Sequence, residues 1–246
     1  MATPKYLDAV RGILDHYEQT QLPAVDQAAD LIVTALTHGG AVFCAEIGHS
    51  NQNDFLNRAG GLAAVQAFSC NVHINDPVAE CLKDRPQPEP FERDLESIRF
   101  AVRASNLRAG DVLLLGSVSG KNRHPIELAL ACQAKGVKVI GFTSLDYTAN
   151  AQSLHPSGKK LCDVCDVVID NGAPYGDAAI EVSGIPAKVC PVSGASMVVG
   201  GWLIWERVME KLSEAGTPPS VFMSINREGG QEFYDKNRAE YNRRGY

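Results

Sequence analysis

A short apolar run, followed by a polar loop and a helix, constrains the fold of this chain more than any other segment. Residues 112–115 form an unbroken apolar run, which is typical of a parallel strand buried on both faces. The loop that follows, residues 116–122, consists mainly of small and hydroxyl-bearing residues. Pro125 predicts the start of a helix, because a proline at a first helical position loses no needed hydrogen bond.

An anion can bind where such a strand, loop and helix N-terminus meet, because backbone N–H groups and the helix dipole converge there. Ser117, Ser119, Gly120 and Asn122 lie in this loop and could wrap a phosphate group. The alternative is that the loop only caps the helix. A cap needs a single hydroxyl, whereas this loop offers several, so we expect a phosphate-binding site.

Short apolar runs and helical patterns alternate along the rest of the chain, which predicts an α/β fold. Its doubly wound parallel sheet would be flanked by helices on both sides, and ligands would bind at the carboxyl ends of the strands. Further strands are expected at residues 41–45, 137–142, 164–169 and 182–191, with a strand or turn at 62–68. Helices are expected at residues 6–18, 21–36, 51–57, 91–107 and 194–212.

The same pattern divides the chain into three parts. These are N-terminal helices at residues 1–40 that pack on the domain, an α/β domain at 41–212 and a polar tail at 213–246. The tyrosines of the tail predict that it docks on the protein. A polar, proline-rich stretch at residues 76–96 is expected to be an exposed connection, with a lid over the site as the alternative.

Charge and composition limit the partners of the chain. A net charge of −6 argues against nucleic acid as the main partner, because no basic surface gathers phosphate backbones. No apolar run is long enough to span a membrane and the N-terminus lacks a secretory pattern, so a cytoplasmic protein is expected. Cys162 and Cys165 form a C-x-x-C pair without the second pair that zinc needs, which favours reduced structural thiols. We expect neither a metal nor another cofactor.

Polar residues also follow two other predicted strands. His49 and Ser50 come after the strand at 41–45, and Thr143 and Ser144 end the strand at 137–142. The carboxyl ends of parallel strands meet at one edge of a sheet. We therefore expect these residues to share one ligand with the serine loop, residues 116–122.

The loop Ser117-Val118-Ser119-Gly120-Lys121-Asn122 resembles the S-x-S-G-x-[ST] loop of the SIS (sugar isomerase) domain family. Asn122 stands where a hydroxyl residue is usual, and Gly48-His49-Ser50 resembles the family's other serine turn. The likeness spans roughly residues 28–212. The combination of His49-Ser50, Arg58-Ala59-Gly60-Gly61, Asn122 and the His155–Lys159 stretch is nearest to a branch of phosphosugar-binding or isomerase proteins. It implies a flavodoxin-like three-layer sandwich, a bound sugar phosphate and a homodimer or homotetramer whose interface completes the site.

Two features of related enzymes are missing from this chain. Heptose-phosphate isomerases and N-acetylmuramate 6-phosphate etherases carry a catalytic glutamate after the first serine turn, but residues 57–61 contain no carboxylate. The histidine on the last helix of the heptose enzymes is also missing, because residues 193–212 contain none. The resemblance therefore supports binding more directly than any one reaction.

Aldose–ketose isomerisation needs a base beside the carbonyl and an acid or cation that stabilises the enediolate. Glu46 leads into the first polar loop and is the first candidate base, and Glu127 on the loop helix is the second. His49 and His124 flank the two loops and could protonate oxygens, and Lys159 could meet the phosphate. Each of these residues could instead be structural or simply exposed.

We therefore expect a phosphosugar-binding protein, most simply a sugar-phosphate isomerase that moves a proton through an enediolate. A lyase or etherase on the same site and a non-catalytic sugar-phosphate sensor are the alternatives. A regulator with an attached DNA-binding domain is disfavoured, because the chain has neither the length nor the charge for one. The apolar helix with Trp202 and Trp205, together with the N-terminal helices, also favours a dimer or tetramer.

Overall fold

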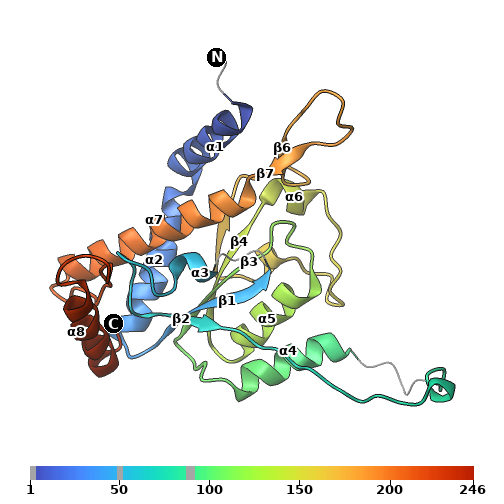
Figure 1. Cartoon of the computed structure of the whole chain (residues 1–246), viewed down its shortest axis with the longest axis horizontal. Helices are drawn as coiled ribbons and strands as arrows, with labels where there is room; N and C mark the ends of the chain where they lie inside the picture. Colours follow the sequence, from blue (N-terminus) through green and yellow to red (C-terminus); the bar gives the residue numbers. More distant parts are fainter. Residues whose placement is uncertain (1–3, 49–51, 87–91) are drawn as a thin grey trace.

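Five parallel strands form the central sheet of the computed structural model, in the order β2-β1-β3-β4-β5 (Figure 1). Residues 4–48, 52–86 and 92–246 are described, except for the side chains of residues 46–48. The strands are β1 (Val42–Gly48), β2 (Val65–Phe68), β3 (Val112–Gly116), β4 (Lys138–Thr143) and β5 (Val167–Asp170). This is the flavodoxin-like order, so the predicted α/β fold is confirmed.

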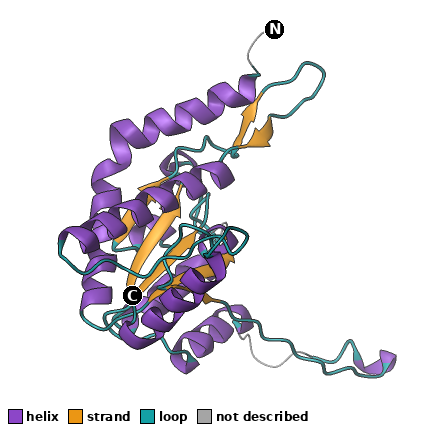
Figure 2. Cartoon of the chain, turned by 60° about the vertical axis from the view of Figure 1, so that its left-hand side comes forward, coloured by secondary structure: helices purple, strands orange, loops and turns teal. Residues whose placement is uncertain are grey.

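Helices cover both faces of this sheet, which gives three layers (Figure 2). The longer helices are α1 (Lys5–His16), α2 (Leu22–Thr37), α4 (Arg93–Ala104), α5 (Arg123–Ala134), α7 (Ser193–Glu214) and α8 (Gly230–Arg244). The short elements are α3 (Gln52–Phe55), α6 (Leu145–Ala149), the 3-10 turns η2 (Glu80–Leu82) and η3 (Leu161–Asp163), and the strands β6 (Ala178–Ile180) and β7 (Val189–Pro191). No helix in the described ranges is long and apolar enough to cross a membrane.

Strand β3 shows why the run at 112–115 is apolar throughout. Val112 and Leu114 pack into the core that the sheet shares with α1, α2 and α7, while Leu113 and Leu115 pack into the core shared with α4 and α5. Successive side chains of a strand point to opposite faces, so a strand covered on both faces needs apolar residues at every position.

The N-terminal helices are joined without a break. A five-residue π-helical turn, η1 (Tyr17–Gln21), connects α1 to α2, and Tyr17 and Gln21 are buried in it. The sequence pattern predicted two helices here and did not reveal this wider turn.

The prediction of a further sheet strand at residues 182–191 is wrong. Strands β6 and β7 instead pair with each other as an antiparallel hairpin, separate from the central sheet. The segment that joins them contains Gly184 and Pro186, which disfavour a continuous strand. Helix α6 follows β4 directly, because the Ser144 hydroxyl accepts a hydrogen bond from the amide of Tyr147 and caps the helix.

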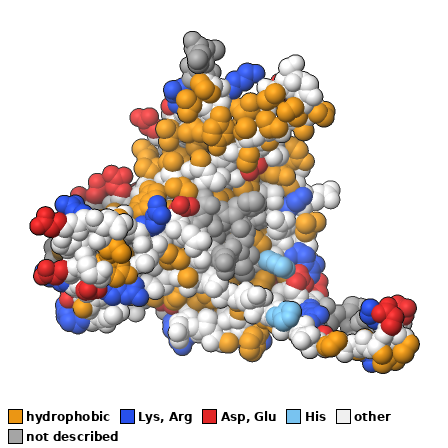
Figure 3. Space-filling model, viewed as in Figure 1, with side chains coloured by type: hydrophobic (Ala, Val, Ile, Leu, Met, Phe, Trp, Pro, Cys, Tyr) orange, Lys and Arg blue, Asp and Glu red, His pale blue; other side chains and the backbone are white. Residues whose placement is uncertain are grey.

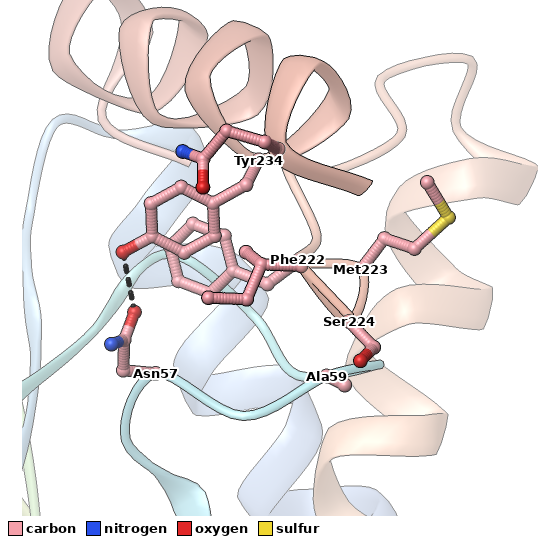
Figure 4. A pocket seen from close by; sticks show the side chains of 8 residues that line it. Asn57, Ala59, Phe222, Met223, Ser224 and Tyr234 are labelled. Carbon is pink, nitrogen blue, oxygen red and sulfur yellow. Dashed lines mark hydrogen bonds between the residues drawn. The ribbon is translucent and has the colours of Figure 1, made fainter. Parts of the chain in front are cut away.

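The C-terminal segment docks on the protein, as its tyrosines predicted, and it forms α8. The backbone amide of Phe222 donates to the carbonyl of Gly61 at 2.9 Å, and the Phe222 ring stacks on Tyr234 at 4.6 Å. The Tyr234 hydroxyl donates to Oδ1 of Asn57 at 2.7 Å (Figure 4). A hollow of about 380 Å³ remains between these groups, lined by uncharged side chains.

Candidate functional site

The serine loop lies at the point where the strand order of the sheet reverses. Gly48 at the end of β1 pairs with Gly116 at the end of β3, and the connections from these two strands lead to opposite sides. This is where open α/β sheets bind ligands. Helix α5 starts directly after the loop at Arg123, with Asn122 as its N-cap residue, so Pro125 is its third residue rather than its first.

Backbone hydrogen bonds fix the conformation of the serine loop. The amide of Ser117 donates to the carbonyl of Phe142 at 2.9 Å, and the amide of Gly120 donates to the carbonyl of Ser117 at 3.0 Å. Gly120 has a φ of +62°, and a Cβ atom there would lie 2.6 Å from Oγ1 of Thr148. Only glycine fits this position without strain.

The hydroxyl of Ser117 is buried and has no hydrogen-bond partner among the described residues. The residue is 1% exposed, and Ser119 beside it is 8% exposed. An unpaired buried hydroxyl is unfavourable unless another group satisfies it, and a ligand at the helix N-terminus is such a group. The side chain of Asn122 makes no capping hydrogen bond, although the residue occupies the capping position.

Thr143 and Ser144 both form hydrogen bonds to the carbonyl of Val118 in this loop, Thr143 through its side chain and Ser144 through its amide. Oγ1 of Thr143 donates to the carbonyl of Val118 at 3.3 Å. The hydroxyl of Ser144 donates to the carbonyl of Ala173 at 2.5 Å. Both side chains are fully buried, so in this structure the protein itself uses the hydroxyls that were expected to meet phosphate.

Glu127 on α5 lies at the centre of a partly buried polar cluster. Its Oε1 accepts from Nε of Arg99 at 2.6 Å, and its Oε2 accepts from Nη2 of Arg99 at 3.2 Å and from Nε2 of His155 at 2.8 Å. Burial alone would raise the pKa of Glu127, but the hydrogen bonds from Arg99 and His155 outweigh it and hold the pKa below its usual value. Glu127 is therefore a carboxylate with both oxygens engaged.

His155 connects this cluster to the serine loop. Its Nδ1 accepts a hydrogen bond from the amide of Ser157 at 3.1 Å. The ring proton is therefore on Nε2, which donates a hydrogen bond to Glu127. The segment around it pairs with the serine loop: the amide of Leu154 donates to the carbonyl of Lys121 at 2.9 Å, and the amide of Leu161 donates to the carbonyl of Gly120 at 2.8 Å. The sequence pattern of this segment gave no sign that His155 would be buried against Glu127.

The remaining candidates lie around the loop. Lys159 is exposed and Lys121 is partly buried, and neither forms an ion pair among the residues placed by the structure. His124 is half exposed and lies 3.4 Å from a carboxylate oxygen of Asp94 on α4. The side chain of Glu46, and His49 and Ser50 altogether, lie outside the described residues.

The C-x-x-C pair and the possible metal ligands can be examined in the described part of the chain. Cys162 and Cys165 are free thiols, and burial is the main cause that raises the pKa of both. A raised pKa disfavours the reactive thiolate. Within the described ranges, no group of three or more histidine, cysteine, aspartate or glutamate side chains could hold a metal ion.

The SIS domain family matches residues 5–144, which is more than half of the chain. The chain belongs to the SIS domain family. This confirms the resemblance seen in the serine loop, and the matched region begins earlier than the residues that carried it.

Full-length relatives and solved structures agree with this membership. A UPF0309 protein from Halalkalibacterium halodurans is 34% identical over 243 residues, which cover 96% of this chain and 96% of that protein. A phosphoheptose isomerase from Neisseria gonorrhoeae superposes with a TM-score of 0.52 over 85% of this chain and 96% of its own, at 19% identity. Another, from Francisella tularensis, gives a TM-score of 0.50 over 83% and 94%, at 15% identity. At these identities the two structures show that the SIS fold is shared.

Proposed function

We propose that this protein binds a phosphorylated sugar, with the phosphate at the serine loop and the N-terminus of α5. The observation that carries the proposal is the buried hydroxyl of Ser117, which has no partner in the described structure. A phosphate oxygen there would accept from this hydroxyl and from the free backbone N–H groups of the first helical turn. Lys121 and Lys159 would add positive charge beside it, in a chain whose net charge is −6.

The sugar would extend from the phosphate toward the carboxyl end of β1. Strands β1 and β3 are neighbours, and Glu46, His49 and Ser50 occur in sequence at or just after the end of β1. Ser50 would then share the ligand with Ser117 and Ser119.

We further propose an aldose–ketose isomerisation with Glu46 as the base and His49 as the acid. Glu127 was the other candidate base, but its two oxygens are held by Arg99 and His155, which leaves it poorly placed to accept a substrate proton. His124 faces a carboxylate on α4, which favours a structural role. The phosphoheptose isomerases that share the fold support an isomerase only by analogy.

A non-catalytic sugar-phosphate sensor is the second candidate. The engaged state of Glu127 and the lack of a carboxylate in residues 57–61 favour it. A sensor and an enzyme would use the same phosphate contacts and differ only in whether a proton moves.

A thermal-shift screen of aldose and ketose phosphates tests the binding proposal. At least one sugar phosphate should raise the melting temperature, and the same sugar without its phosphate should not. If no sugar phosphate raises the melting temperature, the proposal is contradicted. NMR of the hit in deuterated water then tests the reaction. Exchange of one C–H next to the carbonyl indicates an isomerase, release of a substituent indicates a lyase or etherase, and an unchanged spectrum indicates a sensor.

A further inference from the structure

Three side chains form a series of hydrogen bonds that ends at an exposed serine. The hydroxyl of Ser157 donates to Nδ1 of His155 at 2.8 Å, and Nε2 of the same ring donates to Oε2 of Glu127 at 2.8 Å. Arg99 on α4 holds the other oxygen of Glu127 at 2.6 Å. A serine, a histidine and a carboxylate therefore lie in the order in which a histidine activates a serine hydroxyl.

The partners of each group fix the direction of these hydrogen bonds. A carboxylate only accepts, so the ring proton of His155 is on Nε2 and Nδ1 has a lone pair. Oγ of Ser157 accepts from the amide of Lys159 at 3.2 Å, which leaves the proton of the Ser157 hydroxyl directed at Nδ1. The hydroxyl therefore already points its proton at a base.

Only the serine end of the series is open to solvent. The side chains of His155 and Glu127 are each 5% exposed, whereas Ser157 is exposed. Hydrogen bonds between groups sheltered from water are stronger than those in water, so the carboxylate can stabilise a protonated imidazole. A reagent can reach the hydroxyl without disturbing the two groups behind it.

Ser153 is a second serine of the same segment and provides a matched control. It also lies two residues from His155, on the other side. Its hydroxyl donates to the carbonyl of Lys159 at 2.6 Å and accepts from the amide of His155 at 3.1 Å. A backbone carbonyl does not take up a proton, so Ser153 has no base.

We propose that Ser157 is a nucleophile that takes an acyl group from small activated esters, with His155 as its base and Glu127 as a positioning residue. Oγ of Ser157 forms a bond to the carbonyl carbon of the ester, and the bond from that carbon to the leaving oxygen breaks. The hydroxyl proton passes to Nδ1 of His155 and from there to the leaving group or to water. This reaction is separate from the proposed binding of a sugar phosphate and does not depend on it.

The backbone around Ser157 limits the class of donor. The amide of Gly158 donates to the carbonyl of His155 at 2.9 Å, and the amides of Ser157 and Lys159 donate to Nδ1 of His155 and to Oγ of Ser157. Residues 157–159 therefore offer no free N–H group to an oxyanion, which usually makes a large contribution to acyl transfer. We expect reaction with esters that have an acidic leaving group, such as aryl esters and acyl phosphates, and none with alkyl esters or amides.

Treatment of the full chain with p-nitrophenyl acetate, an ester with an acidic leaving group, tests the acyl step. Mass spectrometry of peptides from samples quenched early should find an acetyl group on Ser157. It should form there at least about 100-fold faster than on Ser153, because general-base assistance contributes roughly 10²–10⁴ in rate. Ser157→Ala should lose this adduct and Ser153→Ala should keep it. Equal rates on the two serines, or no acetyl group on Ser157, overturn the proposal.

A fluorophosphonate with short alkyl groups tests the nucleophile with an adduct that is not hydrolysed quickly. Oγ of Ser157 should displace fluoride from its phosphorus. A long alkyl chain is unsuitable, because apolar side chains gather over the end of the molecule that holds α1 and the β6–β7 hairpin (Figure 3). Tyr6 on α1 is 37% exposed, and an adduct there without one on Ser157 overturns the proposal.

The pH profile of this labelling tests the base in the unaltered protein. The rate at Ser157 should rise from acid to neutral pH, because a protonated imidazole cannot accept the serine proton. A rate that does not change over this range contradicts His155 as the base.

Two glutamate variants test the positioning residue. The ring of His155 contacts Glu127, which pairs with Arg99, and Arg99 also pairs with Glu96. Glu127→Gln should slow the labelling about tenfold or more and move its half-maximal rate to lower pH, because the imidazolium loses its carboxylate partner. Glu96→Gln, which removes only the exposed partner of Arg99, should change neither. Circular dichroism checks that both variants are folded, and wild-type rate and pH profile in a folded Glu127→Gln contradict the role of Glu127.

Discussion

The imidazole Nε2 of His155 lies 2.8 Å from Oε2 of Glu127, and both side chains are only 5% exposed. This contact joins the helix that follows the serine loop to the segment that pairs with the loop from the other side. The pair therefore holds the two borders of the candidate phosphate site at a fixed separation. Arg99 on α4 forms an ion pair with Glu127 and so neutralises the buried carboxylate.

The stability of the fold should depend on this buried carboxylate. Glu127→Gln removes a charge-assisted hydrogen bond to Arg99, so we expect the free energy of unfolding to fall by about 2 kcal/mol. Glu96 pairs with the same guanidinium at 2.6 Å but is 37% exposed, so Glu96→Gln should cost less than about 1 kcal/mol. Urea unfolding measures both, and equal losses would contradict the structural role of Glu127.

The same pair predicts the pH dependence of stability. Because the pKa of Glu127 is lowered on folding, its contribution is fully present above the ordinary glutamate pKa of about 4.3 and is lost as the pH falls through the lowered value. The difference in unfolding free energy between wild type and Glu127→Gln should therefore shrink below about pH 4. A difference that stays constant down to acid unfolding would show that Glu127 has an ordinary pKa.

Ser117→Ala separates ligand binding from folding. The hydroxyl has no partner in the described structure, so its removal should leave the melting temperature unchanged or slightly higher. A hydrogen bond to a charged phosphate contributes about 1.5–3 kcal/mol, so affinity for a phosphosugar should fall about 10- to 100-fold. Ser220→Ala is the control, because Ser220 is equally buried but lies at the C-terminal segment. Normal binding with a lower melting temperature would make the loop a structural cap.

Glu46→Gln tests the proposed base. Loss of a general base costs roughly 10²-fold or more in turnover, while phosphosugar binding should survive because the phosphate contacts remain. Calorimetric titration and the exchange of the substrate C–H in deuterated water measure the two effects separately. Unchanged turnover would move the proton transfer to another group, and His49→Gln would then be the next variant to measure.

The same substitution should have different effects on stability at two glycines of α7. A Cβ atom at Gly201 would collide with the ring of Phe55 on α3, whereas a Cβ at Gly194 would meet nothing within 4 Å. Gly201→Ala should therefore destabilise by about 1–3 kcal/mol, and Gly194→Ala should be neutral or slightly stabilising. Since α3 lies next to β1 at the carboxyl end of the sheet, where we propose that the sugar binds, Gly201→Ala should also weaken phosphosugar binding. Thermal unfolding and ligand titration of both variants check this.

The central part of the fold could be predicted because its signals are local. The apolar run at 112–115, the small polar loop and the helix after it are adjacent in sequence, and each has a pattern of its own. The hairpin β6–β7 was missed because short apolar runs do not reveal which strand they pair with. Helix α8 was missed because it is polar and its apolar contacts are few.

The polar cluster of the site could not be predicted in the same way. Glu127 and His155 are 28 residues apart and meet only because the segment after α6 folds back over the serine loop. A histidine in a polar loop gives no sign of burial. Likewise, nothing in the sequence distinguished Thr143, whose hydroxyl donates to the loop, from Ser117, whose hydroxyl has no partner among the residues that the structure describes.

The π-helical turn between α1 and α2 connects the start of the chain to the carboxyl end of β5 and to α7. Oε1 of Gln21 accepts from the amide of Asp170 at the end of β5, and the Tyr17 hydroxyl donates to the carbonyl of Ser196 on α7. A fragment that begins at residue 41 would lose both of these contacts, one of them fully buried and the other partly buried. We therefore expect that the smallest autonomously folding, sugar-binding piece of this protein includes its first two helices.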